Sequence, residues 1–295
     1  MVWNHPSCMK NSAKSVKSGT AARGQKEAAE PAVKLPPKPS LKTTKLTSKS
    51  GPLAPVSPLK LAAKETVGKR ILVIDIGGSN VKVMIADQPR RKIPTRTAST
   101  PSQLVSEVLA NTQDWKFDAI SIGFPAPVEN GNILKEPNNL APGWMKFNWE
   151  KAFGKPVRII NDAAMQALGS YEGGRMLFLG LGTGLGSALV HHGALIPLEL
   201  CAARYSKQLT LEDVLGKRGY KRIGLAKWEK ALGEIVELLR SWFLVDYIVL
   251  GGGNVKKLAK LPEGTRPGDN QNAFIGGVRM WSPKIEAANQ PDAGF

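Results

Sequence analysis

The chain has 295 residues, enough for one large domain or two ordinary ones. Two cysteines, Cys8 and Cys201, give no support for a disulfide framework or a cysteine zinc site, and no apolar run approaches the roughly 18 residues of a membrane span. The chain also starts without the hydrophobic core of a signal peptide. We therefore expect no zinc, no membrane and a reducing, cytoplasmic location.

The positive charge is concentrated at the start of the chain. The chain has 41 Lys and Arg residues and 24 Asp and Glu residues. Residues 1–69 contain 13 of the basic and 3 of the acidic residues, which leaves 28 basic and 21 acidic residues in the rest. A basic body suits a polyanionic partner such as a phosphate chain or a nucleic acid. Solubility alone explains the same charge, and composition does not choose between the two.

Residues 1–69 are predicted to be a disordered basic tail. They are rich in Lys, Ser, Thr, Pro and Ala and show no sustained hydrophobic period. A transit peptide shares the low acid content, but arginines are few and no amphipathic helix is clear. The tail also lacks the two helices joined by a short turn that a helix-turn-helix requires, so no specific nucleic acid partner is expected. Non-specific binding to nucleic acid stays open.

Strand and helix patterns alternate from residue 71 onwards, which predicts an α/β fold. The strand patterns are "ILVIDI", "VKVMIA", "FDAISIGFPAPV", "VRIIND", "MLFLGLGTGLGSALVHHGALI" and "DYIVLGGG". The helix patterns are "SQLVSEVLAN", "AAMQALGSY", "KWEKALGEIVELLRSWF" and "NVKKLAK". A strand–turn–strand at Asp75 to Val83 is echoed at Gly182 to Val190, about a hundred residues later. This echo indicates two related halves that face each other across a cleft.

The first turn, "DIGGSN", combines glycines with polar side chains at the end of a buried strand. Gly77 and Gly78 allow a tight turn whose N–H groups can point at a phosphate, and Ser79 and Asn80 add side-chain donors. Asp75 is a candidate Mg²⁺ ligand, because Mg²⁺ keeps several waters and needs few carboxylates. A hairpin that only needs glycine for its geometry is the alternative.

Two later glycine loops have the same character. "GLGTGLGS" places Gly182, Thr183 and Gly184 between two apolar strands, yet it fits neither the P-loop nor the dinucleotide fingerprint. "VLGGGN" ends a strand with Gly251, Gly252 and Gly253 before a predicted helix, where a phosphate chain or nucleotide can bind. A glycine-kinked strand and an ordinary strand-to-helix turn are the structural alternatives.

In this order, the three loops resemble the sugar-kinase, actin and Hsp70 superfamily, and within it the ROK family of sugar kinases and repressors. "GFPAPVENG", "NNLAPGW" and "IINDA" are similar to further ROK motifs, and the match extends from Ile71 to Gly253 and on towards "NAFIGGVRMW". The resemblance implies an actin-like, ribonuclease H-like fold with two lobes and a central cleft. We assign residues 70–160 to the N-terminal lobe and 161–295 to the C-terminal lobe.

The resemblance also implies roles for individual residues. Asp162 is expected to be the general base that takes the proton of a sugar hydroxyl during phosphoryl transfer. Capping of the following helix is the structural alternative for an Asp at this position. Asn139, Asn161 and Glu199 are expected to contact the sugar together with Asp162, and Asn138 is a neighbour. Family members are often dimers, so a homodimer is compatible with the resemblance.

One part of the family pattern is missing. Where the family carries Gly-His after its sugar-binding Glu, this chain has Cys201 and Ala202 after Glu199. The family's zinc cysteines are also absent, as in the polyphosphate glucokinase branch, and "KQLTLEDVLGKRG" resembles that branch's Thr-x-Glu-Asp-x-x-Gly segment. A polyanionic donor would suit the nearby basic residues, which otherwise coat a solvated face: Lys82, Arg204, Lys207, Lys217, Arg218, Lys221 and Arg222.

The sequence thus leads to three hypotheses. The first is a glucokinase that uses Mg²⁺ and polyphosphate, ATP or both, with the phosphates on the three glycine loops and Lys82. The second is an ATP-dependent kinase for another hexose. The third, prompted by Ala202, is a ROK-type sugar-binding or regulatory protein with impaired catalysis. Residues alone do not fix the donor or separate glucose from mannose.

Overall fold

The computed structural model describes residues 68–77, 80–94, 99–137, 140–269 and 271–282. Part of the sequence-based expectations therefore lies outside the described residues. These are the expectations for the tail up to residue 67 and for Gly78, Ser79, Asn138 and Asn139.

The first sheet has five strands in the order β3-β2-β1-β4-β7. The central strand β1 (Ile71–Ile76) pairs antiparallel with β2 (Asn80–Met84), which pairs antiparallel with β3 (Arg91–Pro94). On its other side β1 runs parallel to β4 (Ala119–Phe124), and β4 runs parallel to β7 (Val157–Asn161). Every residue of β1 and β4 is buried, which explains their unbroken apolar runs.

The second sheet repeats this plan with the order β10-β9-β8-β11-β12. The strand β8 (Arg175–Leu181) pairs antiparallel with β9 (Leu185–His191), and β9 with β10 (Ala194–Leu198). Parallel pairing links β8 to β11 (Tyr247–Gly251) and β11 to β12 (Thr265–Pro267). Three antiparallel strands and two parallel ones follow each other in both sheets, which confirms the two related halves that the echoed hairpins predicted.

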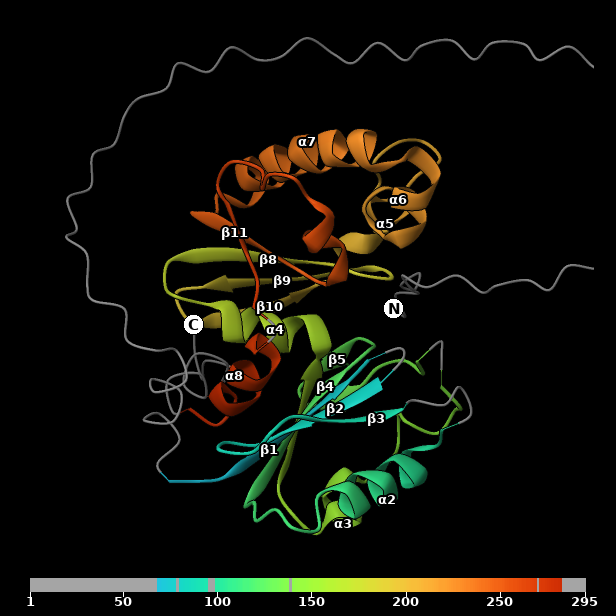
Figure 1. Ribbon diagram of the computed structural model, residues 1–295, viewed down its shortest axis with the longest axis vertical. Helices are drawn as coiled ribbons and strands as arrows, with labels where there is room; N and C mark the ends of the chain where they lie inside the picture. The colour runs from blue at the N-terminus through green and yellow to red at the C-terminus, as the bar shows by residue number, and fades with distance from the viewer. Residues whose placement is uncertain (1–67, 78–79, 95–98, 138–139, 270, 283–295) are drawn as a thin grey trace, which may run out of the picture. The chain divides into compact units, whose positions relative to one another are not determined.

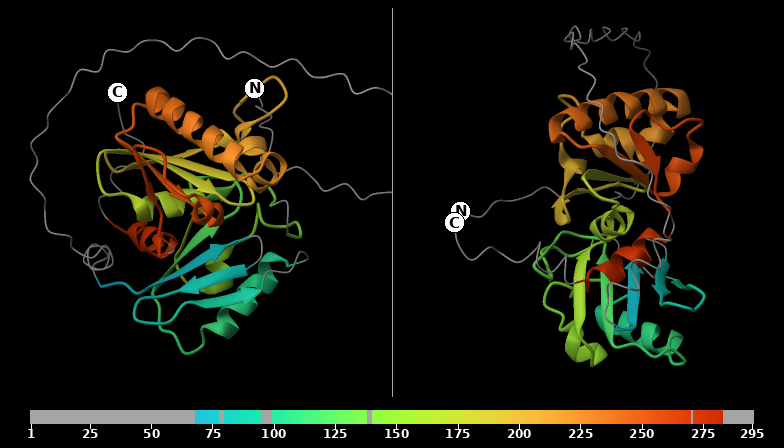
Figure 2. Two further views of the ribbon diagram at one scale, coloured as in Figure 1. Left: turned by 45° about the horizontal axis from the view of Figure 1, so that its top comes forward. Right: turned by 90° about the vertical axis from the view of Figure 1, so that its left-hand side faces the viewer.

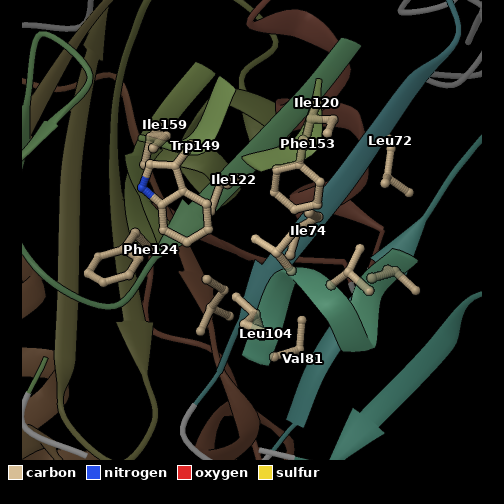
Figure 3. Packing of buried hydrophobic residues seen from close by; sticks show 14 of the residues in the cluster. Leu72, Ile74, Val81, Leu104, Ile120, Ile122, Phe124, Trp149, Phe153 and Ile159 are labelled. Carbon is tan, nitrogen blue, oxygen red and sulfur yellow. The ribbon is translucent and has the colours of Figure 1, made fainter. Parts of the chain in front are cut away.

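The outer face of the first sheet is covered by α2 (Pro101–Asn111) and α3 (Trp149–Phe153). Thr100 and Gln103 form a capping box that starts α2, and Asn148 caps α3. Figure 3 shows aromatic rings from this layer, including Trp149 and Phe153, packed on aliphatic residues of the strands. A two-stranded hairpin, β5 (Val128–Glu129) and β6 (Asn132–Ile133), follows β4.

The outer face of the second sheet carries the helices α5 (Leu211–Leu215), α6 (Lys217–Ile223) and α7 (Leu225–Phe243), seen above the sheet in Figure 1. Two 3₁₀ helices, η1 (Leu200–Ala202) and η2 (Gly253–Lys257), belong to the same layer. The amphipathic pattern of α7 buries Trp228, Leu232 and Leu239 against β8 and β11.

The helix α4 (Asp162–Ser170) packs against both sheets, as Figures 1 and 2 show. Its Met165 and Leu168 join a cluster with β1, whereas Ala163, Ala164 and Ala167 join a cluster with β8 and β9. The last helix, α8 (Asn272–Arg279), packs on α4 and on the first sheet, although its residues fall in the predicted C-terminal lobe. The lobe boundary itself stays a prediction.

One sequence expectation differs from the structure, and several elements of the structure were not expected. "NVKKLAK" was expected to be a helix of its own, but only the short 3₁₀ helix η2 forms there, after a glycine in a left-handed conformation at Gly252. The periodic patterns also gave no sign of β3, α5, α6, β12 or α8. Among the described residues, no helix is long and apolar enough to cross a membrane.

Candidate functional site

Asp162 is the first residue of α4 and lies just beyond the carboxyl end of β7. The register places Asp75 of β1 beside Gly123 of β4, and Gly123 beside Ile160 of β7. The strand ends that carry Asp75 and Asp162 therefore meet at one edge of the first sheet. Ligands of open α/β sheets bind at this carboxyl edge.

Gly123 lets α4 approach the sheet closely. A Cβ atom at Gly123 would lie 2.3 Å from Met165 Cε and 3.4 Å from Asp162 Cα, so a larger residue would have to displace the Met165 side chain of α4. On the opposite side, a Cβ atom at Gly186 of β9 would lie 2.7 Å from Ala163 Cβ. The two glycines thus position Asp162 between the first sheet and the glycine-rich hairpin of the second.

A cross-strand ion pair lies next to Asp162. Asp75 and Lys82 face each other in the β1–β2 register, and Lys82 Nζ is 2.7 Å from Asp75 Oδ2. The Asp75 residue is only 3% exposed, so its charge is compensated inside the protein by the half-exposed Lys82. Asp75 and Lys82, both predicted to lie at the phosphate site, are therefore joined to each other.

The electrostatic surroundings of Asp162 favour its protonated form. Burial, first of all, and the carboxylates of Asp75 and Glu199 raise the pKa of Asp162 to about 7, against the opposing effects of the Ala163 N–H and of Lys82. The Ala163 N–H lies 2.8 Å from Asp162 Oδ1. A carboxylate that exchanges its proton near neutral pH is suited to general base catalysis.

Asp75, beside Asp162, fits a Mg²⁺ ion. Mg²⁺ commonly takes one or two carboxylates, waters and substrate phosphates. Asp75 and Asp162 repel each other electrostatically, and a divalent cation beside them would relieve that repulsion. No group of three or more His, Cys, Asp or Glu residues that could hold a metal occurs in the part of the chain that the structure describes.

Asn161 has a structural role that the sequence did not distinguish. Its Oδ1 accepts hydrogen bonds from Ala163 N at 2.9 Å and Ala164 N at 3.2 Å, which caps α4. Its Nδ2 donates to Ala126 O at 3.3 Å. The cap of α4 is thus supplied by Asn161. Capping by Asp162, the structural alternative to a catalytic role for that residue, is not what the structure shows. Sugar contact by Asn161 stays a proposal.

The turn between β8 and β9 contains Gly182, Thr183 and Gly184. Gly182 N donates to Gly184 O at 3.1 Å, and Thr183 is exposed. A Cβ atom at Gly182 would meet nothing within 4 Å, so this position faces open space. A glycine turn with space beside it offers room for a phosphate group.

The third glycine loop packs against this turn. A Cβ atom at Gly252 would lie 2.5 Å from Leu181 O, and one at Gly251 would lie 2.5 Å from Phe178 Cζ, so both glycines are needed for packing. A Cβ atom at Gly253, in contrast, would meet nothing within 4 Å. Of the three, Gly253 is the position with space for a ligand.

The first loop is described only in part. Gly77 N donates to Asn80 O at 3.0 Å, which closes a tight turn between β1 and β2. This places Asn80 at the start of β2, two residues before Lys82. The turn brings the loop to the same strand end as Asp75, as the sequence predicted.

Glu199 is exposed and lies directly before η1. The buried Ser187 of β9 fixes the backbone on both sides of it, because Ser187 Oγ donates to Leu198 O at 2.8 Å and accepts from Leu200 N at 3.1 Å. Cys201 Sγ lies 3.2 Å from Glu199 Oε2. Cys201, which stands where the family has Gly, is thus a core residue. It contacts Glu199, the residue that is predicted to bind the sugar.

The "TLED" segment supports the glycine turn. Thr210 and Asp213 form a capping box at the start of α5. Glu212, on the same helix, accepts from Leu185 N at 3.3 Å, and its Oε2 would lie 2.6 Å from a Cβ atom at Gly184. The position of Glu212 beside the turn was not predicted, since nothing in the local sequence shows which loop α5 contacts.

Two cavities of about 330 and 340 Å³ lie elsewhere in the described residues. One is at the C-terminal end of α4 beside Arg266 and Arg279, and the other follows the edge strand β7. Neither is lined by Asp162 or by the glycine turns. The aligned strand ends, rather than these cavities, therefore locate the candidate active site.

Comparison with known proteins relates most of this region to one family. Residues 71–197 match the model of the ROK family. A polyphosphate glucokinase of Mycobacterium tuberculosis (strain CDC 1551 / Oshkosh) is 26% identical over 215 residues, which are 63% of this chain and 78% of the relative. The matched region includes the candidate site from Asp75 to the β8–β9 turn.

Two solved structures show the same fold. The polyphosphate/ATP-glucomannokinase of Arthrobacter sp. strain KM superposes with a TM-score of 0.62 at 23% identity, over 72% of this chain and 98% of the other. A ROK family glucokinase of Streptomyces griseus, solved with glucose and AMPPNP, superposes with a TM-score of 0.56 at 16% identity, over 72% and 98%. The chain therefore has the actin-like fold of ROK sugar kinases and carries the ROK family pattern over residues 71–197, as its ordered motifs predicted.

Proposed function

We propose that the protein is a sugar kinase that transfers the terminal phosphoryl group of polyphosphate, ATP or both to the 6-hydroxyl of glucose. The observation that carries the proposal is Asp162, a carboxylate with a pKa raised to about 7 that is held between the first sheet and the β8–β9 turn. The similarity to a polyphosphate glucokinase supports glucose and the donor.

In the proposed reaction, the sugar oxygen attacks the terminal phosphorus of the donor. A new O–P bond forms, the bridging P–O bond to the rest of the donor breaks, and the shortened phosphate chain or ADP leaves. Asp162 accepts the hydroxyl proton, and Glu199, Asn139 and Asn161 hold the sugar. Bound Mg²⁺ would neutralise phosphate charge, with Asp75 as the residue that would hold it.

The donor phosphates are assigned to the three glycine loops. Gly182 and Gly253 face open space, and Thr183 is exposed. Gly77 and Asn80 at the end of β1 are assigned to the same phosphates, together with Gly78 and Ser79 from the sequence pattern, and Lys82 is a cation next to Asp75. Together these groups supply N–H donors and positive charge. Both stabilise the negative charge of the phosphates in the transition state of phosphoryl transfer.

Asp162→Asn tests the proposal. The amide cannot accept the proton, so we expect glucose 6-phosphate production to fall by about 10²-fold or more with either donor. Asp87→Asn is a matched control, because Asp87 is exposed with a φ of 62°, a conformation that Asn also tolerates. Full turnover by Asp162→Asn, with unchanged glucose binding, would overturn the assignment of Asp162.

One observation favours a second candidate, a ROK-type protein that binds sugar without phosphorylating it. Cys201 is only 2% exposed and the side chain of Ala202 cannot donate a hydrogen bond, so the Gly-His part of the family pattern has no counterpart here. Calorimetric titration with glucose, mannose and related hexoses separates the candidates. Sugar binding without product from polyphosphate or ATP would favour the second one.

A further inference from the structure

Two short elements converge on the β8–β9 turn. Gly182 O accepts from the Lys217 N–H at the start of α6, at 3.1 Å, and from Asn254 Nδ2 of η2, at 2.9 Å. The elements α6 and η2 are themselves in contact, since Lys257 Nζ lies 3.8 Å from the centre of the Tyr220 ring. They therefore form one surface that begins at the proposed phosphate site.

This surface has an unusual charge. Four of the seven residues of α6, "KRGYKRI", are basic, two of the five residues of η2, "GNVKK", are basic, and neither element contains an acid. The basic side chains are exposed. Within the described residues, four of them take part in no ion pair: Lys217, Lys221, Lys256 and Lys257.

The arrangement is unfavourable for the protein alone. Lys217 and Lys221 are four residues apart on α6, as are Arg218 and Arg222, and like charges at this spacing destabilise a helix. Arg222 reduces the cost by donating to Asp213 O at 2.8 Å, but the side chains of Lys217 and Lys221 have no such partner among the described residues. A polyanion that binds along the surface would relieve this repulsion.

We propose that Lys217, Lys221, Lys256 and Lys257, here called the basic face, bind the trailing phosphates of inorganic polyphosphate whose terminal group lies at the β8–β9 turn. The inference rests on the proposed function and makes it more specific. A chain of phosphates carries negative charge along its whole length, whereas the charge of a nucleoside triphosphate ends at the nucleoside. The basic face therefore favours long polyphosphate over tripolyphosphate and ATP.

The test is the charge-neutralising double variant Lys221→Gln/Lys256→Gln in the full-length protein. Both side chains are exposed, and the hydrogen bonds to Gly182 O come from other groups. We expect kcat/KM for long-chain polyphosphate to fall about three- to tenfold more than kcat/KM for tripolyphosphate or ATP, since exposed ion pairs are each weak. The preference of the wild type for the long chain should also decline as salt is raised.

Two controls isolate the basic face. Lys151→Gln/Lys155→Gln removes the same charge from exposed positions in and just after α3, far along the chain from α6 and η2, and should leave the ratio between donors unchanged. Lys221→Arg/Lys256→Arg keeps the charge and should keep the preference. Residues 1–69 are basic too, so polyphosphate could also bind to them. A binding measurement would not tell these residues from the basic face, and the test therefore uses the ratio of kcat/KM values between donors.

The outcomes separate this inference from the proposed function. A wild type that makes no glucose 6-phosphate from any donor would overturn both. A wild type that prefers long polyphosphate, with the same preference in Lys221→Gln/Lys256→Gln, would overturn the basic face alone. An equal loss with all three donors would also overturn it, because the lysines would then act on the terminal phosphates or on folding.

Discussion

The raised pKa of Asp162 suits general base catalysis but lowers the stability of the folded protein. Its pKa is about 7 in the folded protein and 3.8 is its ordinary value. Below about pH 4 both states hold the proton, so Asp162 has no effect on the free energy of unfolding. Between about pH 4 and 7 only the unfolded state ionises, and the folded state loses stability as pH rises, with a constant penalty above about pH 7.

We therefore expect Asp162→Asn to stabilise the protein without ligands at neutral and alkaline pH. The amide removes the charge that burial, Asp75 and Glu199 disfavour. The gain in melting temperature should be close to zero near pH 4, should grow up to about pH 7 and should then level off. Thermal unfolding across this range measures it, and a gain that does not change with pH would contradict the raised pKa.

Lys82 provides a test of the electrostatic coupling at the same scale. It lowers the pKa of Asp162 and neutralises Asp75. In Lys82→Met both effects are lost, so we expect the acidic limb of the kcat/KM profile to move upwards by about half a pH unit or more. A lower kcat/KM at every pH with an unmoved midpoint would mean that Lys82 contacts only the donor.

At the scale of elements, glycines determine how closely α4 and α8 pack. A Cβ atom at Gly276 of α8 would lie 1.8 Å from Met165 O of α4, and one at Gly169 would lie 1.8 Å from Asn272 O. Additional bonds hold the pair, among them Asn272 Nδ2 to Ser170 Oγ at 2.6 Å. The contact is a backbone-to-backbone one, which cannot adjust by rotation of a side chain.

Two substitutions of glycine by alanine should therefore change the free energy of unfolding in opposite directions. Gly276→Ala should lower the free energy of unfolding by about 3 kcal/mol, because α8 must move away from α4. Gly233→Ala, in the middle of α7 with nothing within 4 Å of the added Cβ, should raise it by about 0.5–1 kcal/mol. Denaturant unfolding of both variants measures the effects, and destabilisation by Gly233→Ala would show that helix propensity is not the governing term there.

At the scale of the whole molecule, the sequence predicts what depends on local pattern. The hairpins of β1–β2 and β8–β9 follow from apolar runs joined by glycine turns, and their echo predicts the repeated strand order. Asp162 is predicted through a motif and through its place between a strand and a helix. These features are each encoded within a few neighbouring residues.

Features that depend on distant contacts were not predictable. Ser121 Oγ donates to Gly277 O, 156 residues away, and this bond helps to place α8 on the first sheet. Likewise, nothing near Lys256 and Lys257 in the sequence shows that they lie beside α6. Gly123 and Gly186 both belong to motifs, but those motifs do not show that the two glycines contact α4.

The burial of α4 has a consequence for the way this protein can change over evolutionary time. Only Asp162 and Gln166 among its nine residues keep part of their surface exposed, and the other seven are buried. An ordinary surface helix has one face on which substitutions accumulate freely, but α4 has none. Its sequence should therefore drift far more slowly than that of α7, and enlarging any of its alanines would require a compensating loss of volume in a sheet.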